Sequence, residues 1–189
     1  MALRANFYSF DLGKLTDLFG SRKEDVVMRL RPLARDMYPE EPKLVVDHIK
    51  RAIRENPPFE DLEIEDEAWV CAGELLTREQ EKKYFVEFDW QASSFATLAS
   101  ALEEELSAQA RELLTFLAQG RPLFGTAIKT AWSYYAYVTR KEALVLADEL
   151  RRFGDTQVPQ GVARLFVLDL VAVLDSCEQR DADLWMLAS

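Results

Sequence analysis

Residues 132–138 have the sequence WSYYAYV, and this stretch decides the fold class. Aromatic and β-branched side chains favour the pleated surface of a sheet, so the stretch predicts a strand in the last third of the chain. Successive side chains of a strand point to opposite faces. One face would carry Trp132, Tyr134, Ala136 and Val138, and the other Ser133, Tyr135, Tyr137 and Thr139. One face is expected to contact helices, and the other then presents phenols and hydroxyls.

Two more strands are predicted near the ends of the chain. Residues 6–10 (NFYSF) and 183–188 (DLWMLA) have strand-forming composition, and most of the chain between them has helical spacing. This order favours a small, mainly antiparallel sheet formed by N- and C-terminal strands. No stretch has the Pro, Gly and Ser content of a linker. The sequence therefore predicts a single, predominantly helical α+β domain over residues 1–189.

Three capping boxes mark expected helix starts. In residues 21–24, 77–80 and 139–142, a Ser or Thr hydroxyl and a Glu or Gln side chain can satisfy free amides of a first helical turn. Residues 83–90 alternate as a strand does but also fit one helix face, and we favour the helix because a capping box precedes them. Pro32 is expected to kink or end the helix that follows the first box, since proline lacks an amide donor.

Residues 94–119 are expected to form one long helix. Its Leu and Phe residues recur at helical spacing, the segment is rich in Ala, Glu and Leu, and Gly120 follows it. At 1.5 Å per residue this helix would be roughly 35–40 Å long. Residues 162–177 are also predicted to be helical and are apolar on most sides, so this second helix is expected to lie centrally.

The charge of the chain is unevenly distributed. There are 23 basic and 33 acidic residues, a net charge of −10, and residues 61–120 alone hold 4 basic and 14 acidic residues. Such a surface repels a phosphate backbone, so nucleic-acid binding is not expected. It can instead attract a basic protein partner over long range. No apolar run is long enough for a membrane span, and we expect a soluble cytoplasmic protein without a membrane partner.

The sequence lacks the motifs of common enzymes and metal sites. It has no zinc-protease, serine-hydrolase or dinucleotide-binding motif. The two cysteines, Cys71 and Cys177, are too far apart for a zinc site of the usual spacing, and their apolar helical surroundings predict buried reduced thiols. We therefore expect no cofactor and no metal, and the absence of catalytic motifs favours a protein that is not an enzyme.

One group of residues is a candidate pocket or contact. Its members are Trp132, Tyr134, Tyr135, Tyr137, Asp169 and Trp185. Asp169 shares a face of a nearly all-apolar helix with Phe166 and Val173, so its carboxylate is expected to be partly buried. A structural hydrogen bond from Asp169 to the sheet is the favoured interpretation. A functional acid in a pocket and simple exposure are the alternatives.

Several segments at the chain ends resemble a known family. They are the strand 6–10 running into Asp11-Leu12, then Gly20-Ser21-Arg22, residues 132–137 and the closing Asp183-Leu184-Trp185. Together they resemble an uncharacterised bacterial family, one of the domains of unknown function. The resemblance implies a small α+β protein and assigns no activity, cofactor or functional residue.

Two functions follow as predictions. The first is a non-enzymatic protein-binding or regulatory protein whose acidic face meets a basic partner, as an inhibitor or immunity protein does. The alternative is a small-molecule binder or enzyme with a pocket at residues 132–138 and Asp169. A homo-oligomer formed through the long helix or an edge strand is compatible with either function.

Overall fold

The fold is that of a computed structural model, and the residues described are 3–57, 59, 67–79, 81–123, 133–154 and 164–188. The chain forms two compact units. The sheet unit comprises Met1–Phe10, Lys82–Arg121 and Trp132–Ser189. The helical unit comprises Asp11–Glu81 and Pro122–Ala131. Each unit is described by itself, and the single domain over residues 1–189 stays a prediction.

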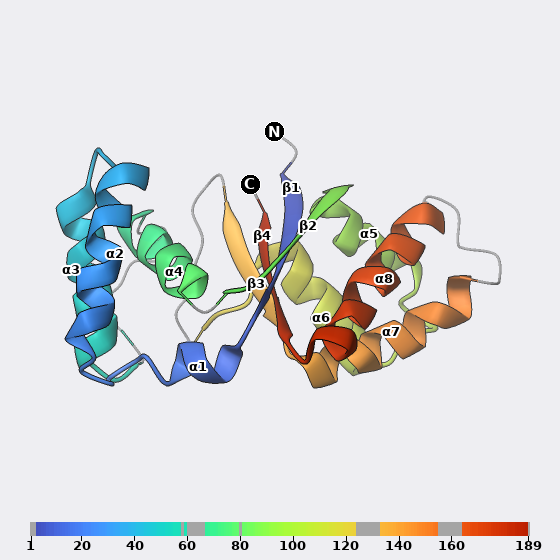
Figure 1. Cartoon of the computed structure of the whole chain (residues 1–189). Helices are drawn as coiled ribbons and strands as arrows, with labels where there is room; N and C mark the ends of the chain where they lie inside the picture. Colours follow the sequence, from blue (N-terminus) through green and yellow to red (C-terminus); the bar gives the residue numbers. More distant parts are fainter. Residues whose placement is uncertain are drawn as a thin grey trace. The chain divides into compact units, whose positions relative to one another are not determined.

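The sheet brings together strands from both ends of the chain. Its order is β2-β1-β4-β3 (Figure 1), with β1 at Arg4–Phe10, β2 at Glu81–Gln91, β3 at Tyr134–Val138 and β4 at Asp183–Ala188. β4 pairs antiparallel with β1 on one side and with β3 on the other. Trp185 lies opposite Tyr8 in β1 and opposite Tyr137 in β3. The predicted sheet, formed by N- and C-terminal strands, is confirmed.

Helices of the sheet unit lie together on one side of the sheet (Figure 1). They are α5 (Ser93–Ala101), α6 (Ala108–Gln119), α7 (Arg140–Gly154) and α8 (Arg164–Arg180). The strands send Phe7, Ala136 and Met186 into a core that also holds Leu146 and Phe166 of the helices. Alternate strand residues reach this core because the pleat turns every second side chain to the same face. The predicted α+β class with a majority of helix is confirmed.

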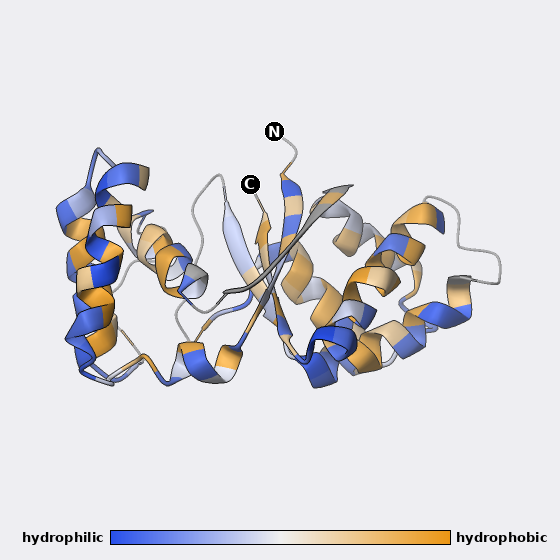
Figure 2. Ribbon diagram, viewed as in Figure 1, coloured by the Kyte–Doolittle hydropathy of each residue, from blue (hydrophilic) through white to orange (hydrophobic). Residues whose placement is uncertain are grey.

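The helical unit contains α1 (Leu12–Thr16), α2 (Glu24–Met37), α3 (Pro42–Arg54) and α4 (Glu67–Arg78). Asp11 caps α1 by accepting a hydrogen bond from the Lys14 amide, and Pro42 lies in the first turn of α3. Each longer helix has an apolar face, and Trp69 of α4 is almost fully buried. The alternation of hydrophilic and hydrophobic residues along α2 and α3 is visible in Figure 2. Across the described ranges, none of the helices combines the length and apolar character that a membrane crossing requires.

The single long helix expected over residues 94–119 is wrong. The chain forms α5 and α6 instead, and a turn at residues 102–107 separates them. Ser107 begins α6, because its Oγ accepts a hydrogen bond from the Ala110 amide at 3.1 Å. Leu102 and Leu106 at the turn are nevertheless buried, which explains why the apolar spacing continued through it.

The helix favoured for residues 83–90 is also wrong, because these residues belong to β2. The capping box at 77–80 that supported this prediction is wrong as well, because Thr77 begins no helix. Thr77 lies inside α4 and its Oγ1 donates to the carbonyl oxygen of Gly73 at 2.8 Å. The strand alternation was therefore the correct signal, and Phe88 of β2 is buried in the core of the sheet unit.

Two expectations about α2, the cap at Ser21 and the helix end at Pro32, are also wrong, whereas the kink expected at Pro32 stays a prediction. Ser21 is not the N-cap of the helix, because that position is Lys23, whose own side chain makes no capping hydrogen bond. The Ser21 hydroxyl instead accepts from the Lys23 amide at 3.3 Å. Pro32 does not end α2, which continues to Met37. Pro32 removes the donor for the carbonyl of Met28, and both residues lie on the exposed side of the helix, where water can bond to that carbonyl.

Candidate functional site

The face of the sheet opposite the helices carries a cluster of aromatic side chains, the aromatic face: Phe10, Tyr135, Tyr137 and Trp185. The ring centroid of Trp185 lies 5.2 Å from that of Tyr135, 5.4 Å from Phe10 and 6.4 Å from Tyr137. Trp185 and Tyr137 are stacked, with 10° between their planes. These contacts follow from the register, which sets Tyr137 directly beside Trp185 on the neighbouring strand.

Arg121 extends this cluster at the edge of the aromatic face. Its Cζ lies 4.3 Å from the ring centroid of Tyr137 and 4.7 Å from that of Phe116, so the guanidinium contacts two aromatic rings. The chain reaches this position through Gly120, whose φ of 94° is unfavourable for other residues. A Cβ on Gly120 would lie 3.2 Å from the carbonyl oxygen of Tyr135. A close approach of the backbone to β3 therefore places Arg121 over Tyr137.

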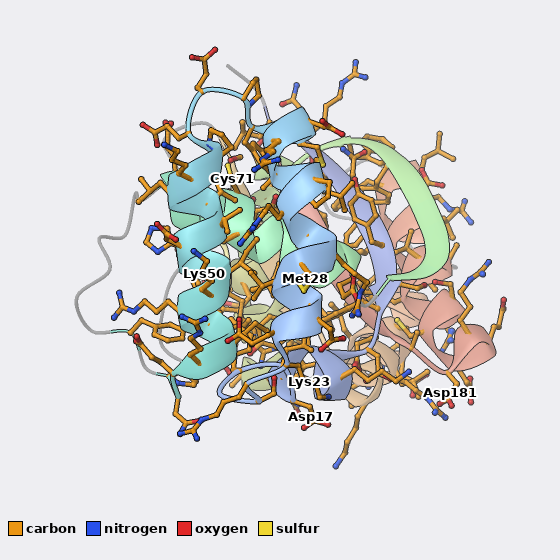
Figure 3. All side chains as sticks on the ribbon, turned by 60° about the vertical axis from the view of Figure 1, so that its left-hand side comes forward. Asp17, Lys23, Met28, Lys50, Cys71 and Asp181 are labelled. Atoms are coloured by element: carbon orange, nitrogen blue, oxygen red, sulfur yellow. The ribbon has the colours of Figure 1, made fainter. Side chains whose placement is uncertain are left out.

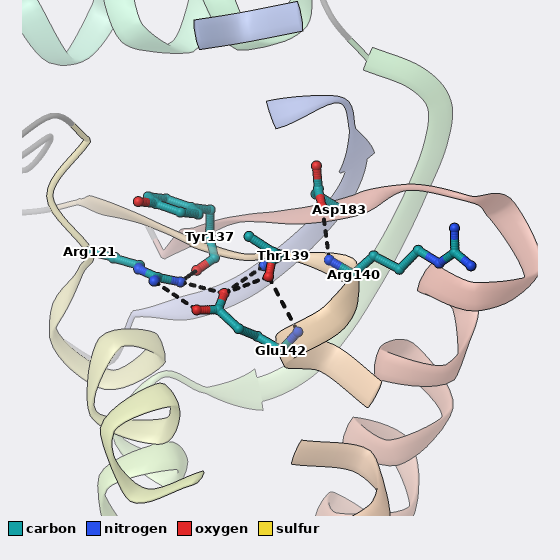
Figure 4. A network of polar contacts seen from close by, with 6 residues as sticks. All are labelled: Arg121, Tyr137, Thr139, Arg140, Glu142 and Asp183. Atoms are coloured by element: carbon teal, nitrogen blue, oxygen red, sulfur yellow. Dashed lines mark hydrogen bonds and ion pairs between the residues drawn. The ribbon is translucent and has the colours of Figure 1, made fainter. Parts of the chain in front are cut away.

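The Arg121 guanidinium forms a bidentate ion pair with Glu142, shown in Figure 4, at 2.8 and 2.9 Å. Its Nη1 also donates to the carbonyl oxygen of Tyr137 at 3.2 Å. Glu142 accepts a hydrogen bond from the Thr139 amide at 2.9 Å, and the Glu142 amide donates to Thr139 Oγ1 at 3.3 Å. The capping box predicted at residues 139–142 is therefore confirmed, and the same carboxylate holds Arg121.

The electrostatics of this network keep both partners charged. Burial acts to raise the pKa of the Glu142 carboxyl, but hydrogen bonds from Arg121 and from Thr139 outweigh it, so the pKa is lowered. Burial acts to lower the pKa of the Arg121 guanidinium, and Glu142 outweighs it in the same way. An arginine committed to a carboxylate, a carbonyl and two rings has little capacity left for a ligand. We interpret the network as a structural brace between β3 and α7.

The structure separates the predicted candidate residues. Tyr134 faces the core, and its hydroxyl group lies within hydrogen-bonding distance of the carbonyl oxygens of Leu117 and Ala118, at 2.9 and 2.7 Å. Burial raises the pKa of the Tyr134 phenol well above its ordinary value. Tyr135 and Trp185 are buried on the opposite face, and Tyr137 beside them is partly exposed. Trp132 lies outside the described residues.

Asp169 is exposed rather than partly buried. The favoured interpretation, a structural hydrogen bond to the sheet, is confirmed, because Asp169 Oδ2 accepts from Trp90 Nε1 of β2 at 2.8 Å. Asp169 belongs to α8, which contributes Phe166 to the core on the helical side of the sheet. It is therefore not brought together with Tyr135 and Tyr137, and these three residues do not line one pocket.

The turn between α5 and α6 presents three consecutive exposed carboxylates, the acidic turn: Glu103, Glu104 and Glu105. Buried Leu102 and Leu106 anchor the turn on either side. Glu149 of α7 accepts from the Ser107 amide at 2.8 Å and from its hydroxyl at 2.6 Å, which fixes the end of the turn. The carboxylates are thus held on a defined backbone and point outward.

Comparisons with protein-family models, with curated proteins and with solved structures found no match. The resemblance at the chain ends therefore stays a prediction, and no residue of this chain receives a role from a relative.

Of the two cysteines predicted to be buried, Cys177 is buried and Cys71 is not. Cys71 is half-buried, and both cysteines are reduced. Burial raises the pKa of Cys71 to about 11, with further contributions from Glu74 and Glu67, and raises that of Cys177 to about 12. Within the described ranges there is no group of three His, Cys, Asp or Glu side chains that could hold a metal ion.

The sequence did not predict the Arg121 network or the acidic turn as features. The acidic turn was hidden by the assumption of one continuous helix, although Ser107 is a typical N-cap residue within that segment. The sequence indicates a helix stop and a turn at Gly120, and the structure shows that this glycine also allows the approach that positions Arg121. The acidic residues 60–66, a second contribution to the charge imbalance, lie outside the described residues.

Proposed function

We propose that this chain is a non-catalytic binding protein and that its acidic turn engages a basic partner protein. The observation that carries the proposal is the exposure of Glu103, Glu104 and Glu105 in succession on an anchored turn. Among the described residues only one of them has a cationic partner, since Glu103 lies 3.8 Å from Arg111. Glu104 and Glu105 therefore remain available for a cation supplied by another molecule.

Two physical arguments support this function. Exposed carboxylates contribute little individually in water, but a concentration of one charge sign accelerates encounter with an oppositely charged partner. The turn is fixed by Leu102, Leu106 and the Ser107–Glu149 contact, so binding would cost less ordering entropy than a mobile acidic loop. A protein that inhibits a basic enzyme or toxin by covering it is the specific form of this function that we favour.

The alternative function, a pocket at the aromatic strand, receives less support. Its three polar groups, Tyr135, Tyr137 and Asp169, lie on two faces of the sheet, and Asp169 is bonded to Trp90. A catalytic acid would need to approach the same ligand as the phenols. We therefore retain the binding protein as the proposal.

Affinity capture from a native lysate at low salt, read by mass spectrometry, tests the proposal. The bait variants are Glu103→Gln/Glu104→Gln/Glu105→Gln and the matched control Asp36→Asn/Glu40→Gln/Glu41→Gln, which removes three exposed carboxylates of the helical unit. The expected result is a basic protein retained by the wild type and the control, lost with the acidic-turn variant and released by salt. Recovery of no basic protein, or equal recovery with both variants, contradicts the proposal.

A further inference from the structure

The helical unit contains an open cleft between α2 and α3, with a volume of about 370 Å³. Its lining includes Arg31 and Arg35 from α2 and Lys43, Val46, Asp47 and Lys50 from α3. In Figure 3 the two helices stand side by side on the near side of the view, with Met28 labelled on α2 and Lys50 on α3. This basic cleft shares no residue with the acidic turn, which belongs to the sheet unit.

Three of the cations in the basic cleft lack an acidic partner. Lys50 donates to Asp47 Oδ1 at 2.6 Å. Arg31, Arg35 and Lys43 have no carboxylate oxygen within ion-pair distance anywhere in the described part of the chain. All three side chains are exposed, and none of them has a hydrogen-bond or ion-pair partner among the described residues. The cleft therefore holds an uncompensated positive charge.

The other arginines of α2 and α3 show the opposite behaviour. Arg29, Arg51 and Arg54 each contact a carboxylate, at distances of 2.5–2.8 Å. Within these two helices, the unpaired cations are thus confined to the basic cleft. Arg31 and Arg35 are also four residues apart on one helix face, a spacing at which like charges are destabilising. The repulsion between Arg31 and Arg35 lowers the stability of the free protein, and an anionic ligand between them would remove it.

We propose that the basic cleft binds a small phosphate-bearing molecule with two or more negative charges. Two guanidinium groups can each hold phosphate oxygens in a bidentate manner, and the ammonium group of Lys43 adds a point charge. Val46 and Pro42 supply apolar surface for the body of the ligand. The volume lies at the lower end of the range typical of small-molecule sites, roughly 300–1,000 Å³.

NMR titration of the full chain with sodium pyrophosphate at low ionic strength tests this site. The expected result is saturable shift changes in the backbone amides of residues 31–35 and 43–50. The variant Arg31→Gln/Arg35→Gln is expected to bind at least about tenfold more weakly, because charged hydrogen bonds are lost. The control Lys141→Gln/Arg164→Gln, which removes two exposed cations of the sheet unit, is expected to bind as the wild type does.

Three outcomes overturn the proposal. One is shift changes that do not saturate or that occur outside the two helices. Another is equal weakening in the cleft variant and the control. The third is a protein that does not bind pyrophosphate but binds a different ligand through Arg31 and Arg35. That ligand would be detected by co-sedimentation with phosphatidylglycerol vesicles or by binding of a single-stranded oligonucleotide. That last result would assign the cleft to a lipid surface or to a nucleic acid. Because no variant here alters the acidic turn, each of these results leaves the proposed protein-binding function untouched.

Discussion

Arg121 combines an ion pair, two ring contacts and a hydrogen bond to a backbone carbonyl in one side chain. Its side chain is only 18% exposed and that of Glu142 21% exposed, so water screens their interaction weakly. Glu142 also belongs to the capping box of α7. Its carboxylate therefore accepts from the Thr139 amide at the start of the helix and pairs with the Arg121 guanidinium. Loss of this charge is expected to affect the stability of the sheet unit directly.

We predict that Glu142→Gln lowers the free energy of unfolding by about 2 kcal/mol, because Arg121 then loses a charged partner while its side chain remains mostly buried. Urea denaturation monitored by circular dichroism measures the change. Glu55→Gln is the control, since the Glu55 carboxylate pairs with Arg51 but is 56% exposed. That exposed pair is expected to contribute at most about 1 kcal/mol. Equal losses in the two variants would show that the network does not act as a brace.

At the scale of the element, the separation of α5 from α6 depends on local hydrogen bonds rather than on hydrophobic spacing. Ser107 accepts from the Ala110 amide and donates to Glu149, so a single hydroxyl ends the turn and begins the helix. Glu149 also accepts from the Ser107 amide, which ties α6 to α7.

We predict that Ser107→Ala lowers the free energy of unfolding by about 1 kcal/mol, the usual cost of removing an N-cap side chain. Thr115→Ala is the control, because the Thr115 hydroxyl bonds within α6 to the carbonyl of Arg111 and starts no helix. Thermal denaturation of both variants measures the difference. If Ser107→Ala unfolds at the wild-type temperature, then the Ser107 hydroxyl does not stabilise the turn.

The elements that were predicted correctly share a strong local signal. The strand 183–188 and the capping box 139–142 each depend on residues that are adjacent in sequence, and both match the structure. The errors arose where two local signals conflicted. For residues 83–90, we gave more weight to an incorrect capping box than to the correct strand alternation. In α2, Pro32 lies on the exposed side of the helix, so the helix continues past it.

The candidate site was less predictable, for a physical reason. Strand alternation correctly separated Tyr134 from Tyr135, but no sequence pattern reports which face α8 covers. Asp169 was therefore grouped with phenols that lie across the sheet from it. Whether a cation of α2 or α3 is paired also depends on carboxylates that are distant in sequence. Glu79, for example, pairs with Arg29 from fifty residues away, and the cations of the basic cleft have no such partner among the described residues. Such pairing becomes visible only in three dimensions.

At the scale of the whole molecule, burial keeps several phenol and thiol groups protonated. Burial raises the pKa of Tyr134, Tyr137, Cys71 and Cys177 above their ordinary values. In the unfolded chain these groups ionise from about pH 8.5 for thiols and about pH 10 for phenols. In the folded protein they remain neutral at those pH values. Their contribution to stability is therefore complete at neutral pH and is lost as the pH rises toward the folded pKa values.

We predict that the melting temperature falls steadily between about pH 8.5 and pH 10.5. Tyr134→Phe is expected to be less stable than the wild type at pH 7, because the phenol loses a hydrogen bond to a carbonyl oxygen at the end of α6. Its melting temperature should nevertheless decline less steeply with pH, since one ionisable group is gone. Calorimetric scans across this range provide the measurement. A flat profile for the wild type would contradict the assignment of these groups as buried and neutral.

The position of β4 between β1 and β3 also has a consequence for the nascent protein on the ribosome. β1 is synthesised early, but its partner in this ladder is translated only after nearly all of the intervening chain. Until residues 183–188 emerge, the edges of β1 and β3 that later pair with β4 carry unpaired amides and carbonyls, which are vulnerable to pairing with other chains. We therefore expect the nascent sheet unit to be a stronger client of chaperones than the helical unit.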